Sequence, residues 1–277
     1  MTNLDALFGL DGRVAVVTGG TGVLGSALAR ALSGAGASVA LLARDTERLD
    51  QGVRDLEEYG GEALAVRADV LDRVQVEAAR DAVLERFERI DVLVNAAGGN
   101  VPEATLDETT SFFDLPESGF ERVFALNVVG TLLPSQVFGR AIAEGQGRLD
   151  GCIVNISSMA AQWAISRVVG YSAAKAAVDN LTRWLAVDAA RVYGGRLRVN
   201  AIAPGFFVGA QNRALLLTET GELTPRGQTI VEHTPLGRLG EPDELSSTVL
   251  WLCGPGAGFV NGVVVPVDGG FSAFSGV

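Results

Sequence analysis

The sequence predicts a single α/β domain over residues 1–277, with a doubly wound parallel sheet of seven strands flanked by helices. Three observations favour this fold. Short, almost continuous apolar segments alternate with longer segments of helical periodicity, as parallel strands with helical crossovers require. The first apolar segment, Val14 to Val17, leads through a glycine-rich turn directly into a helical pattern. Finally, no linker, internal repeat or low-complexity tract divides the chain.

The expected elements alternate along the chain. Strands are predicted at 14–17, 38–43, 63–68, 91–95, 152–156, 197–202 and 263–267. Helices are predicted from the glycine turn to residue 34, after Thr46 as N-cap, and at 73–87, 119–143, 170–193 and 242–253. The irregular segment 96–120 predicts a functional insertion near the site. The polar segment 211–232 predicts a lid with short helices, within a substrate segment at about 206–235.

Charge and composition narrow the range of partners. The chain has 22 Lys and Arg against 33 Asp and Glu, a net charge of −11, which disfavours nucleic acid and anionic membranes. No apolar run approaches the roughly 18 residues that span a bilayer, and the first residues lack a signal-peptide pattern, so a cytoplasmic protein is expected. Cys152 and Cys253 lie in apolar contexts without metal-ligand spacing, so we expect buried thiols and no metal.

The glycine-rich turn predicts a dinucleotide site. Residues 20–25 read G-x-G-x-x-G between a strand and a helix. Glycines let the backbone approach a pyrophosphate, and the start of the helix offers unpaired N–H groups and a positive dipole end. The alternative is a glycine-rich turn without a ligand. Other polar residues end the later strands, and in doubly wound sheets ligands bind at that edge.

Tyr171 and Lys175 form a second candidate pair. They lie four residues apart in a predicted helix, on one face and one turn from each other. A lysine cation favours the tyrosinate, so we expect it to lower the pKa of Tyr171 and make this residue a usable acid or base. Taken alone, the pattern is also typical of a solvated helix face.

Together these motifs resemble the classical short-chain dehydrogenase/reductases, which have a Rossmann fold, and the resemblance covers nearly the whole chain. The matching segments are 18–25, 69–70, 95–98, Asn127, Ser158, Tyr171 with Lys175, 204–205 and 267–270. The resemblance implies hydride transfer between nicotinamide C4 of NAD(P)(H) and a carbonyl or secondary alcohol carbon. It also implies a homotetramer, in which Phe271 and Phe274 of the tail pack against a neighbouring subunit.

The resemblance assigns a role to each catalytic candidate. Tyr171 is the general acid in reduction and the base in oxidation, and Lys175 tunes it and binds the nicotinamide ribose. Ser158 hydrogen-bonds the reacting oxygen, and Asn127 holds a water in the proton relay. Ser158 is chosen over its neighbour because it stands thirteen residues before Tyr171, as in relatives. Ser157 is expected to satisfy backbone groups.

The cofactor contacts follow from the same resemblance, with two departures. Val23 replaces the middle glycine of the usual turn, a spacing closer to the epimerase-like branch, and backbone near Val208 stands in for a missing threonine. No acidic residue ends the second strand; Arg44 there favours NADP(H) by pairing with a 2′-phosphate, although it could instead stack on adenine. The expected cofactor-binding residues are Gly19, Thr21, Gly22, Val23, Leu24, Arg44, Asp69, Val70, Asn95, Ala96, Ala97, Tyr171, Lys175, Pro204, Gly205 and Val208.

Within the family, three stretches look most like sugar-acid oxidoreductases of the D-mannonate/D-fructuronate type: 138–140 with the preceding helix, 204–207 with 211–213, and the tail 269–277. In a chain of net charge −11, a carboxylate substrate needs local cations, and Arg167 and Arg213 are placed to supply them. Asn100, Gln211 and Asn212 are candidates for binding hydroxyls. The alternative for both arginines is a surface salt bridge.

Other functions remain open at this stage. The same chemistry could serve another ketone or a 3-ketoacyl substrate, because fold and catalytic residues do not specify the substrate. A nucleotide-binding sensor on this fold would need no proton-transfer residues, and an epimerase or dehydratase would hold its cofactor tightly. His233, the single histidine, is expected to have a capping or surface role rather than a catalytic one.

Overall fold

The computed structural model of the protein describes residues 4–58, 60–107, 110–145, 151–209 and 212–276. At its centre is a seven-stranded parallel sheet in the order β3-β2-β1-β4-β5-β6-β7. The order reverses between β1 and β4, which is where ligands bind in doubly wound sheets. The predicted fold class is confirmed. The strands are β1 (Val14–Thr18), β2 (Ser38–Ala43), β3 (Ala63–Arg67), β4 (Val92–Asn95), β5 (Gly151–Ile156), β6 (Leu197–Pro204) and β7 (Val264–Val267).

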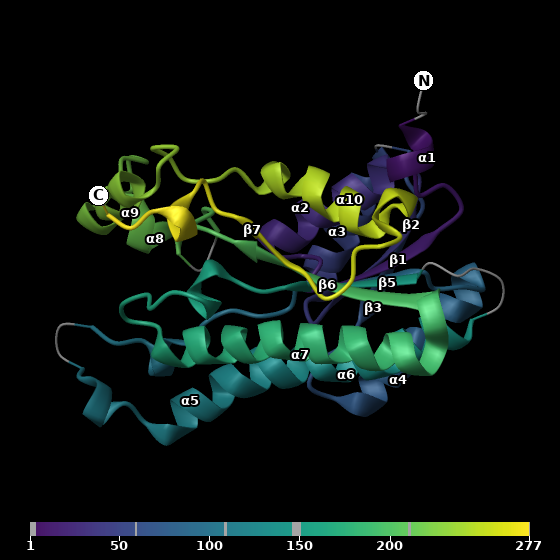
Figure 1. The fold of residues 1–277 in the computed structure, drawn as a ribbon, viewed down its shortest axis with the longest axis horizontal. Coiled ribbons are helices and arrows are strands. Elements are labelled where there is room, and N and C mark those ends of the chain that lie inside the picture. Colours follow the sequence, from purple (N-terminus) through teal and green to yellow (C-terminus); the bar gives the residue numbers. More distant parts are fainter. Residues whose placement is uncertain (1–3, 59, 108–109, 146–150, 210–211, 277) are drawn as a thin grey trace.

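Helices cover both faces of this sheet (Figure 1). One face carries α2, α3 and α10, and the other carries α4, α6 and α7. Val17 belongs to the core on the α2 side and Val16 to the core on the α6 side, so both faces of β1 are buried. This explains the continuous apolar strands. The helices are α1 (Asp5–Phe8), α2 (Val23–Gly34), α3 (Thr46–Glu58), α4 (Arg73–Phe87), α5 (Glu117–Phe124), α6 (Gly130–Glu144), α7 (Val169–Tyr193), α8 (Arg213–Leu216), α9 (Pro225–His233) and α10 (Ser246–Cys253).

Three local predictions differ from the structure. Asp45 rather than Thr46 caps α3, since its carboxylate accepts the N–H of Arg48 at 3.1 Å. The helix predicted at 119–143 is α5 and α6 joined by a π-helical turn, Ala125–Val129, which holds Asn127. The helix predicted at 242–253 begins as a 3-10 turn, Pro242–Leu245, before α10.

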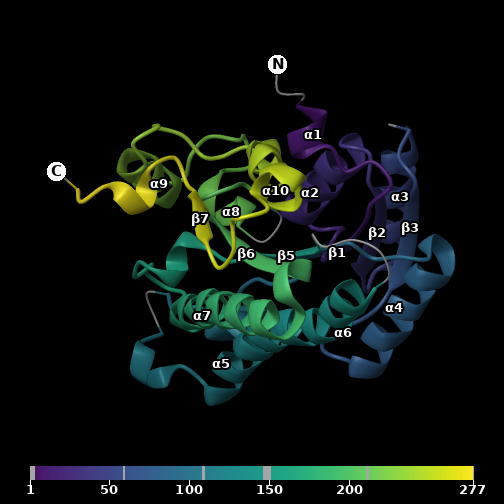
Figure 2. The same ribbon diagram turned by 45° about the vertical axis from the view of Figure 1, so that its right-hand side comes forward.

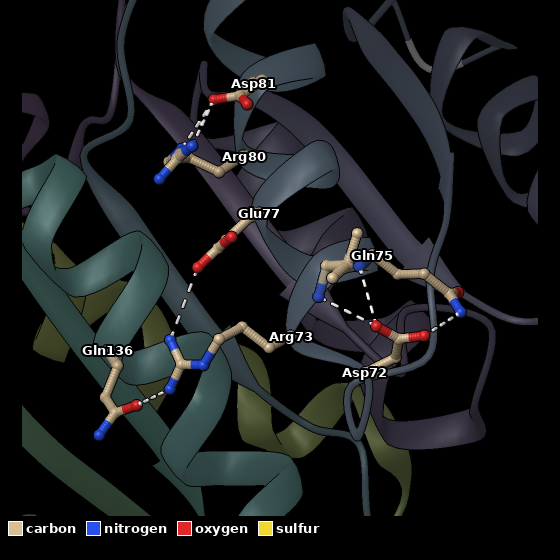
Figure 3. Close-up of polar contacts among 8 residues, drawn as sticks. Asp72, Arg73, Gln75, Glu77, Arg80, Asp81 and Gln136 are labelled. Carbon is tan, nitrogen blue, oxygen red and sulfur yellow. Dashed lines mark hydrogen bonds and ion pairs between the residues drawn. The ribbon is translucent and has the colours of Figure 1, made fainter.

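The start of α4 fixes the loop that follows β3 (Figure 3). Asp72 caps the helix, accepting the N–H of Val74 at 2.9 Å, and hydrogen bonds from Gln75 lower the pKa of its carboxyl. The side-chain oxygen of Gln75 in turn accepts the N–H of Asp69 at 3.0 Å. Arg73 donates to Gln136 of α6. These contacts anchor the loop that carries Asp69 to two helices.

The segment after β6 carries α8 and α9 and lies at the same end of the molecule as the start of α7 (Figures 1 and 2). Phe207 forms an isolated bridge with Gly240, so the segment is anchored where it leaves the sheet. His233, at the end of α9, packs on Phe271 and Phe274, with ring centroids 4.8 and 5.2 Å apart. His233 is therefore neither a cap nor a bare surface residue, and the two phenylalanines already have a partner within the chain.

Cys152 of β5 and Cys253 of α10 are both buried, as predicted, and their sulfur atoms lie 3.9 Å apart. The contact with Cys152, followed by burial, raises the pKa of the Cys253 thiol. Of the helices that the structure describes, none combines the length and apolar character needed to cross a bilayer.

Candidate active site

The glycine turn after β1 packs directly on the segment after β4. Gly19 has a φ of +64°, and a Cβ there would lie 2.7 Å from the backbone nitrogen of Ala97. Thr18 accepts the N–H of Ala97 at 3.2 Å through its hydroxyl. A Cβ on Gly25 would lie 2.3 Å from the Gly19 carbonyl oxygen. Only glycine therefore fits at Gly19 and Gly25, and the turn leads into α2 without side chains in the way.

This turn fits a nucleotide pyrophosphate. Gly22 is the N-cap of α2, and no described side chain caps the first turn of that helix, so its N–H groups and positive dipole end stay available to an anion. Val23, at the middle-glycine position, is 37% exposed and faces Gly209, whose Cβ would lie 3.9 Å from that of Val23. The valine thus lies beside the segment that follows β6 without blocking the turn.

Arginines surround the predicted adenosine end. Arg44 follows β2, is mostly exposed and lies 3.9 Å from Asp69. Arg67 donates to the Arg44 carbonyl at 3.2 Å. Arg48 of α3 donates to the carbonyl of Thr21 in the glycine turn, and sequence reasoning missed it. Its position in the first turn of the helix after β2 is a signal that could have pointed to it.

The four catalytic candidates come together on three elements. Tyr171 and Ser158 share a hydrogen bond. Lys175 donates to the carbonyl of Ile156 at 2.7 Å, and its nitrogen lies 5.6 Å from the centre of the Tyr171 ring. Asn127 exchanges hydrogen bonds with the backbone of Gly99, at 2.7 and 3.0 Å.

Gly98 allows these groups to approach one another. A Cβ on this residue would lie 2.8 Å from the Asn127 side-chain oxygen and 3.2 Å from the Lys175 nitrogen. The end of β4, the π-helical turn and α7 therefore meet at one point.

The expected effect on the pKa of Tyr171 is wrong for this structure. Burial raises the pKa of Tyr171, and the hydrogen bond with Ser158 offsets only part of that rise. The charge of Lys175 is directed at the Ile156 carbonyl rather than at the phenol, so it does not reverse the effect of burial. Tyr171 consequently keeps its proton at neutral pH.

Lys175 is buried and depends on a carboxylate that the sequence analysis missed. Burial lowers the pKa of Lys175 to about 8, and the charge of Asp179, one turn further along α7, opposes that fall. Asp179 accepts a hydrogen bond from the hydroxyl of Ser157. Ser157 therefore binds a carboxylate and not the backbone groups expected for it. The i, i+4 spacing from Lys175 could have identified Asp179.

Other cofactor candidates divide between the sheet and its edge. Asn95 is buried and donates to Ser135 and Asn155 at 2.9 and 2.8 Å, so its amide nitrogen ties β4 to α6 and β5. Gly205 donates to the Val267 carbonyl at 2.9 Å, and a Cβ there would lie 2.7 Å from Asp268. Four candidates lie in loops at the carboxyl edge of the sheet: Val70, Ala96, Ala97 and Val208. Pro204 is the last residue of β6, and Leu24 is the second residue of α2.

The amide candidates for substrate hydroxyls differ in their freedom to bind. Asn100 donates to Thr105 at 2.7 Å, while its buried carbonyl oxygen has no partner among the described residues. Asn212 accepts from the Gly209 N–H at 2.7 Å and donates to the Phe207 carbonyl at 2.8 Å. It therefore stabilises the turn before α8, which opposes its expected substrate role. Gln211 lies outside the described residues.

The arginine candidates also differ. Arg213 is exposed, and no contact of its side chain is found within the described ranges. Arg167 precedes α7 and donates to the Leu106 carbonyl at 2.8 Å. Arg226 of α9, which sequence reasoning missed, donates to the hydroxyl and carbonyl of Ser166 at 3.1 and 3.4 Å. A positive charge in the first turn of a helix is unfavourable, because the N-terminal end of the helix dipole is also positive. This unusual position is a signal in the sequence that could have identified Arg226.

Known proteins share both the sequence and the fold. A family model described as Enoyl-(Acyl carrier protein) reductase matches residues 21–272. The uncharacterised oxidoreductase UxuB of Bacillus subtilis is 46% identical over 97% of this chain and 98% of its own. The chain belongs to the short-chain dehydrogenase/reductase family. Because members bind nicotinamide cofactors and act on alcohol or ketone groups, this family member is an NAD(P)-dependent oxidoreductase.

Two further members of the family have names that indicate substrates. A Haemophilus influenzae structure with bound NAD, provisionally assigned as a D-mannonate oxidoreductase, has a TM-score of 0.90 and 44% identity over 99% of this chain and 100% of its own. Galactitol 2-dehydrogenase (L-tagatose-forming) of Cereibacter sphaeroides is 36% identical over 97% of this chain and 98% of its own. Other solved relatives hold NADH or NADP.

Replacing Asp179 with asparagine should reduce stability more at pH 7 than at pH 10. The pKa of Lys175 is about 8 in the folded protein, against an ordinary value of 10.5. Between these values the unfolded chain binds more protons, so the cost of burying Lys175 falls as the pH rises through this window. Asp179 offsets this cost only while Lys175 is charged. We expect urea unfolding of Asp179→Asn to show an additional loss of about 1–2 kcal/mol at pH 7.

Asp188→Asn, a partly exposed carboxylate on the same helix, is the control and should show no such dependence. An equal loss at both pH values for Asp179→Asn would mean that Asp179 acts only through Ser157.

Proposed function

We propose that this oxidoreductase acts on a sugar acid of the D-mannonate/D-fructuronate type, reducing the ketone or oxidising the secondary alcohol. One observation carries the proposal. Ser158, Tyr171 and Lys175 lie next to the loop that leads into α7, and this loop carries Arg167, two residues before the helix begins. If Arg167 binds the carboxylate of the substrate, the other carbon atoms of the substrate lie near Tyr171. The sugar-acid and polyol names of the relatives support a polyhydroxylated substrate.

Tyr171 is proposed to donate its proton to the carbonyl oxygen in reduction. Its raised pKa suits this role, because the phenol is protonated at neutral pH. Ser158, which bonds Tyr171, orients the same oxygen. When bound, the nicotinamide supplies or accepts the hydride. In oxidation Tyr171 takes the proton back from the alcohol.

Lys175 and Asn127 are proposed to support this proton transfer. The charge of Lys175 favours the tyrosinate that forms as Tyr171 gives up its proton. Among the described residues, the Asn127 side-chain oxygen accepts one hydrogen bond, from the Gly99 N–H at 3.0 Å, so a lone pair stays available to a water in the relay. The nearby Lys175 can pass the proton on.

The cofactor preference is proposed to be NADP(H). Arg44 is exposed at the end of β2, and Arg48 and Arg67 bring two more guanidinium groups to the same end of the site. A 2′-phosphate can accept from such groups, whereas the 2′-hydroxyl of NAD needs an acceptor that Arg44 cannot supply. The Haemophilus relative holds NAD, so the preference requires a direct measurement.

Residues 1–277 are proposed to act as one domain whose segment 206–235 covers the substrate, and to assemble as a homotetramer in the cytoplasm. The outer side of α7 exposes Trp184, Val187 and Val192 to the extent of 62%, 53% and 62%, a row of apolar side chains that a second copy would cover. Two reduced, buried cysteines accord with the cytoplasm.

Tyr171→Phe should abolish turnover while leaving the fold and cofactor binding intact. Loss of the acid/base group is expected to lower kcat for D-mannonate oxidation by about 10²- to 10⁴-fold. The absorbance of the reduced nicotinamide measures kcat, and quenching of protein fluorescence measures cofactor affinity. Tyr193→Phe, at the end of the same helix, is the matched control and should keep full activity. Unchanged kcat in Tyr171→Phe would remove Tyr171 from the mechanism.

Arg44→Asp should shift the preference from NADP toward NAD. The substitution removes a cation for the 2′-phosphate and adds an acceptor for the 2′-hydroxyl, so the ratio of kcat/KM for NADP over NAD should fall about tenfold or more. Steady-state kinetics with both cofactors give the ratio, and Arg54→Asp on the exposed surface of α3 is the control. A wild-type ratio that already favours NAD strongly would contradict the NADP(H) proposal.

Light scattering at micromolar concentration should give a mass four times that of one chain. Trp184→Asp should yield smaller species, because burying an unpaired charge from the α7 row between two copies is costly. A monomeric wild-type protein would contradict the tetramer.

A further inference from the structure

Two arginines from different parts of the chain meet above the start of α7 without a carboxylate between them. Arg167 lies two residues before α7, and Arg226 is the second residue of α9. Arg226 bonds Ser166, the neighbour of Arg167, through both of its terminal nitrogens. The charge of Arg167 acts on Arg226 directly: after burial, it is the second cause that lowers the pKa of the Arg226 guanidinium. No described acidic residue pairs with either arginine.

Both cations lie where local electrostatics oppose them. Each is at the N-terminal end of a helix, where the dipole is positive and favours anions. The two like charges also repel each other. The buried Nε of Arg226 has no partner among the residues described. A buried donor without a described partner and two cations without a described carboxylate together make this arrangement suited to an anion.

The backbone holds Arg167 in an unfavourable conformation that aims it at this position. Its φ is +79°, a left-handed value that a residue with a side chain rarely adopts. The N–H of Leu106 donates to the Arg167 carbonyl at 2.8 Å, and the Nε of Arg167 donates to the Leu106 carbonyl at 2.8 Å. This reciprocal pair uses one donor of the guanidinium and leaves both terminal nitrogens without a described partner. Strain of this kind is typical of ligand-binding positions.

We infer that Arg167 and Arg226 together bind the carboxylate of the substrate, and that Arg226 closes this site from the lid segment. This inference rests on the proposed function and deepens it. Planar guanidinium groups match a carboxylate with paired hydrogen bonds, and a carboxylate bound between two of them offsets their mutual repulsion. Arg167 lies in the loop before α7, four residues ahead of Tyr171 in the sequence. The site therefore selects acids whose carboxylate is several carbons away from the reacting carbon, rather than acids in which the two are adjacent.

The same arrangement links binding to closure. Arg226 belongs to α9, while Arg167 belongs to the loop that leads to Tyr171. The hydrogen bonds from Arg226 to Ser166 hold α9 against that loop, and the repulsion between the two arginines opposes this contact. A bound carboxylate would offset the repulsion and so strengthen the hold of the lid segment over the tyrosine when an acidic substrate is bound.

The test compares D-mannonate with D-mannitol, its uncharged counterpart, as substrates for oxidation. Arg226→Gln should raise KM for D-mannonate by about 10- to 100-fold, the range expected for the loss of a hydrogen bond to a charged group. KM for D-mannitol should change little. Arg226→Lys keeps the positive charge but lacks the planar guanidinium that can form paired hydrogen bonds. Its KM for D-mannonate should fall between those of the wild type and Arg226→Gln. The control is Arg80→Gln, since the Arg80 side chain pairs, among the residues that the structure describes, with its neighbour Asp81 on α4 (Figure 3).

Equal changes in KM for both compounds would overturn the carboxylate site while leaving the oxidoreductase proposal intact. If the wild type oxidises neither compound, the proposed substrate fails, and calorimetric titration of D-mannonate into the protein with bound reduced cofactor tests the site on its own. Binding that is present in the wild type and lost in Arg226→Gln supports the site. Equal binding in both proteins, or none in the wild type, overturns it.

Discussion

The ammonium group of Lys175 is buried, and several groups at the active-site end of the molecule stabilise this buried charge. A buried charge is stable only when hydrogen bonds and an opposite charge replace the lost water. The Ile156 carbonyl supplies a hydrogen bond at the end of β5, and Asp179, held by Ser157, supplies the charge. Gly98 leaves space for the group beside Asn127. Lys175 thereby ties α7 to the end of β5 near Tyr171, in the space that Gly98 leaves beside Asn127.

The sequence was sufficient to predict the sheet and to propose where the site lies. Strands buried on both faces must be apolar at nearly every position, so Val14 to Val17 and the later strands were recognisable within a residue or two of their ends. The parallel arrangement then dictated that the residues after each strand share one edge. The glycine turn was equally readable, because backbone that touches backbone, as at Gly19 and Ala97, leaves no room for another residue type.

What the sequence could not predict depends on distance in space. Arg226 and Arg167 are far apart along the chain, and only the packing of α9 over the loop before α7 makes them a pair. The pKa of Tyr171 depends mainly on how deeply the phenol is buried. The local spacing in the sequence indicates the nearby Lys175 but does not indicate this burial. The π-helical turn at Asn127 has no composition of its own, so a continuous helix was the natural expectation there. Likewise, the sequence does not indicate that the Asn212 side chain hydrogen-bonds the backbone of its own turn.

The position of His233 has a practical consequence for following the enzyme in solution. It is the only histidine in the chain, it ends the helix that carries Arg226, and its ring lies between two phenylalanine rings of the C-terminal segment. Aromatic ring currents shift the proton resonances of a neighbouring imidazole strongly and with a steep dependence on distance. A single, unlabelled histidine signal in a proton NMR spectrum therefore reports the displacement of α9 relative to Phe271 and Phe274, in a spectral window free of overlap from other histidines.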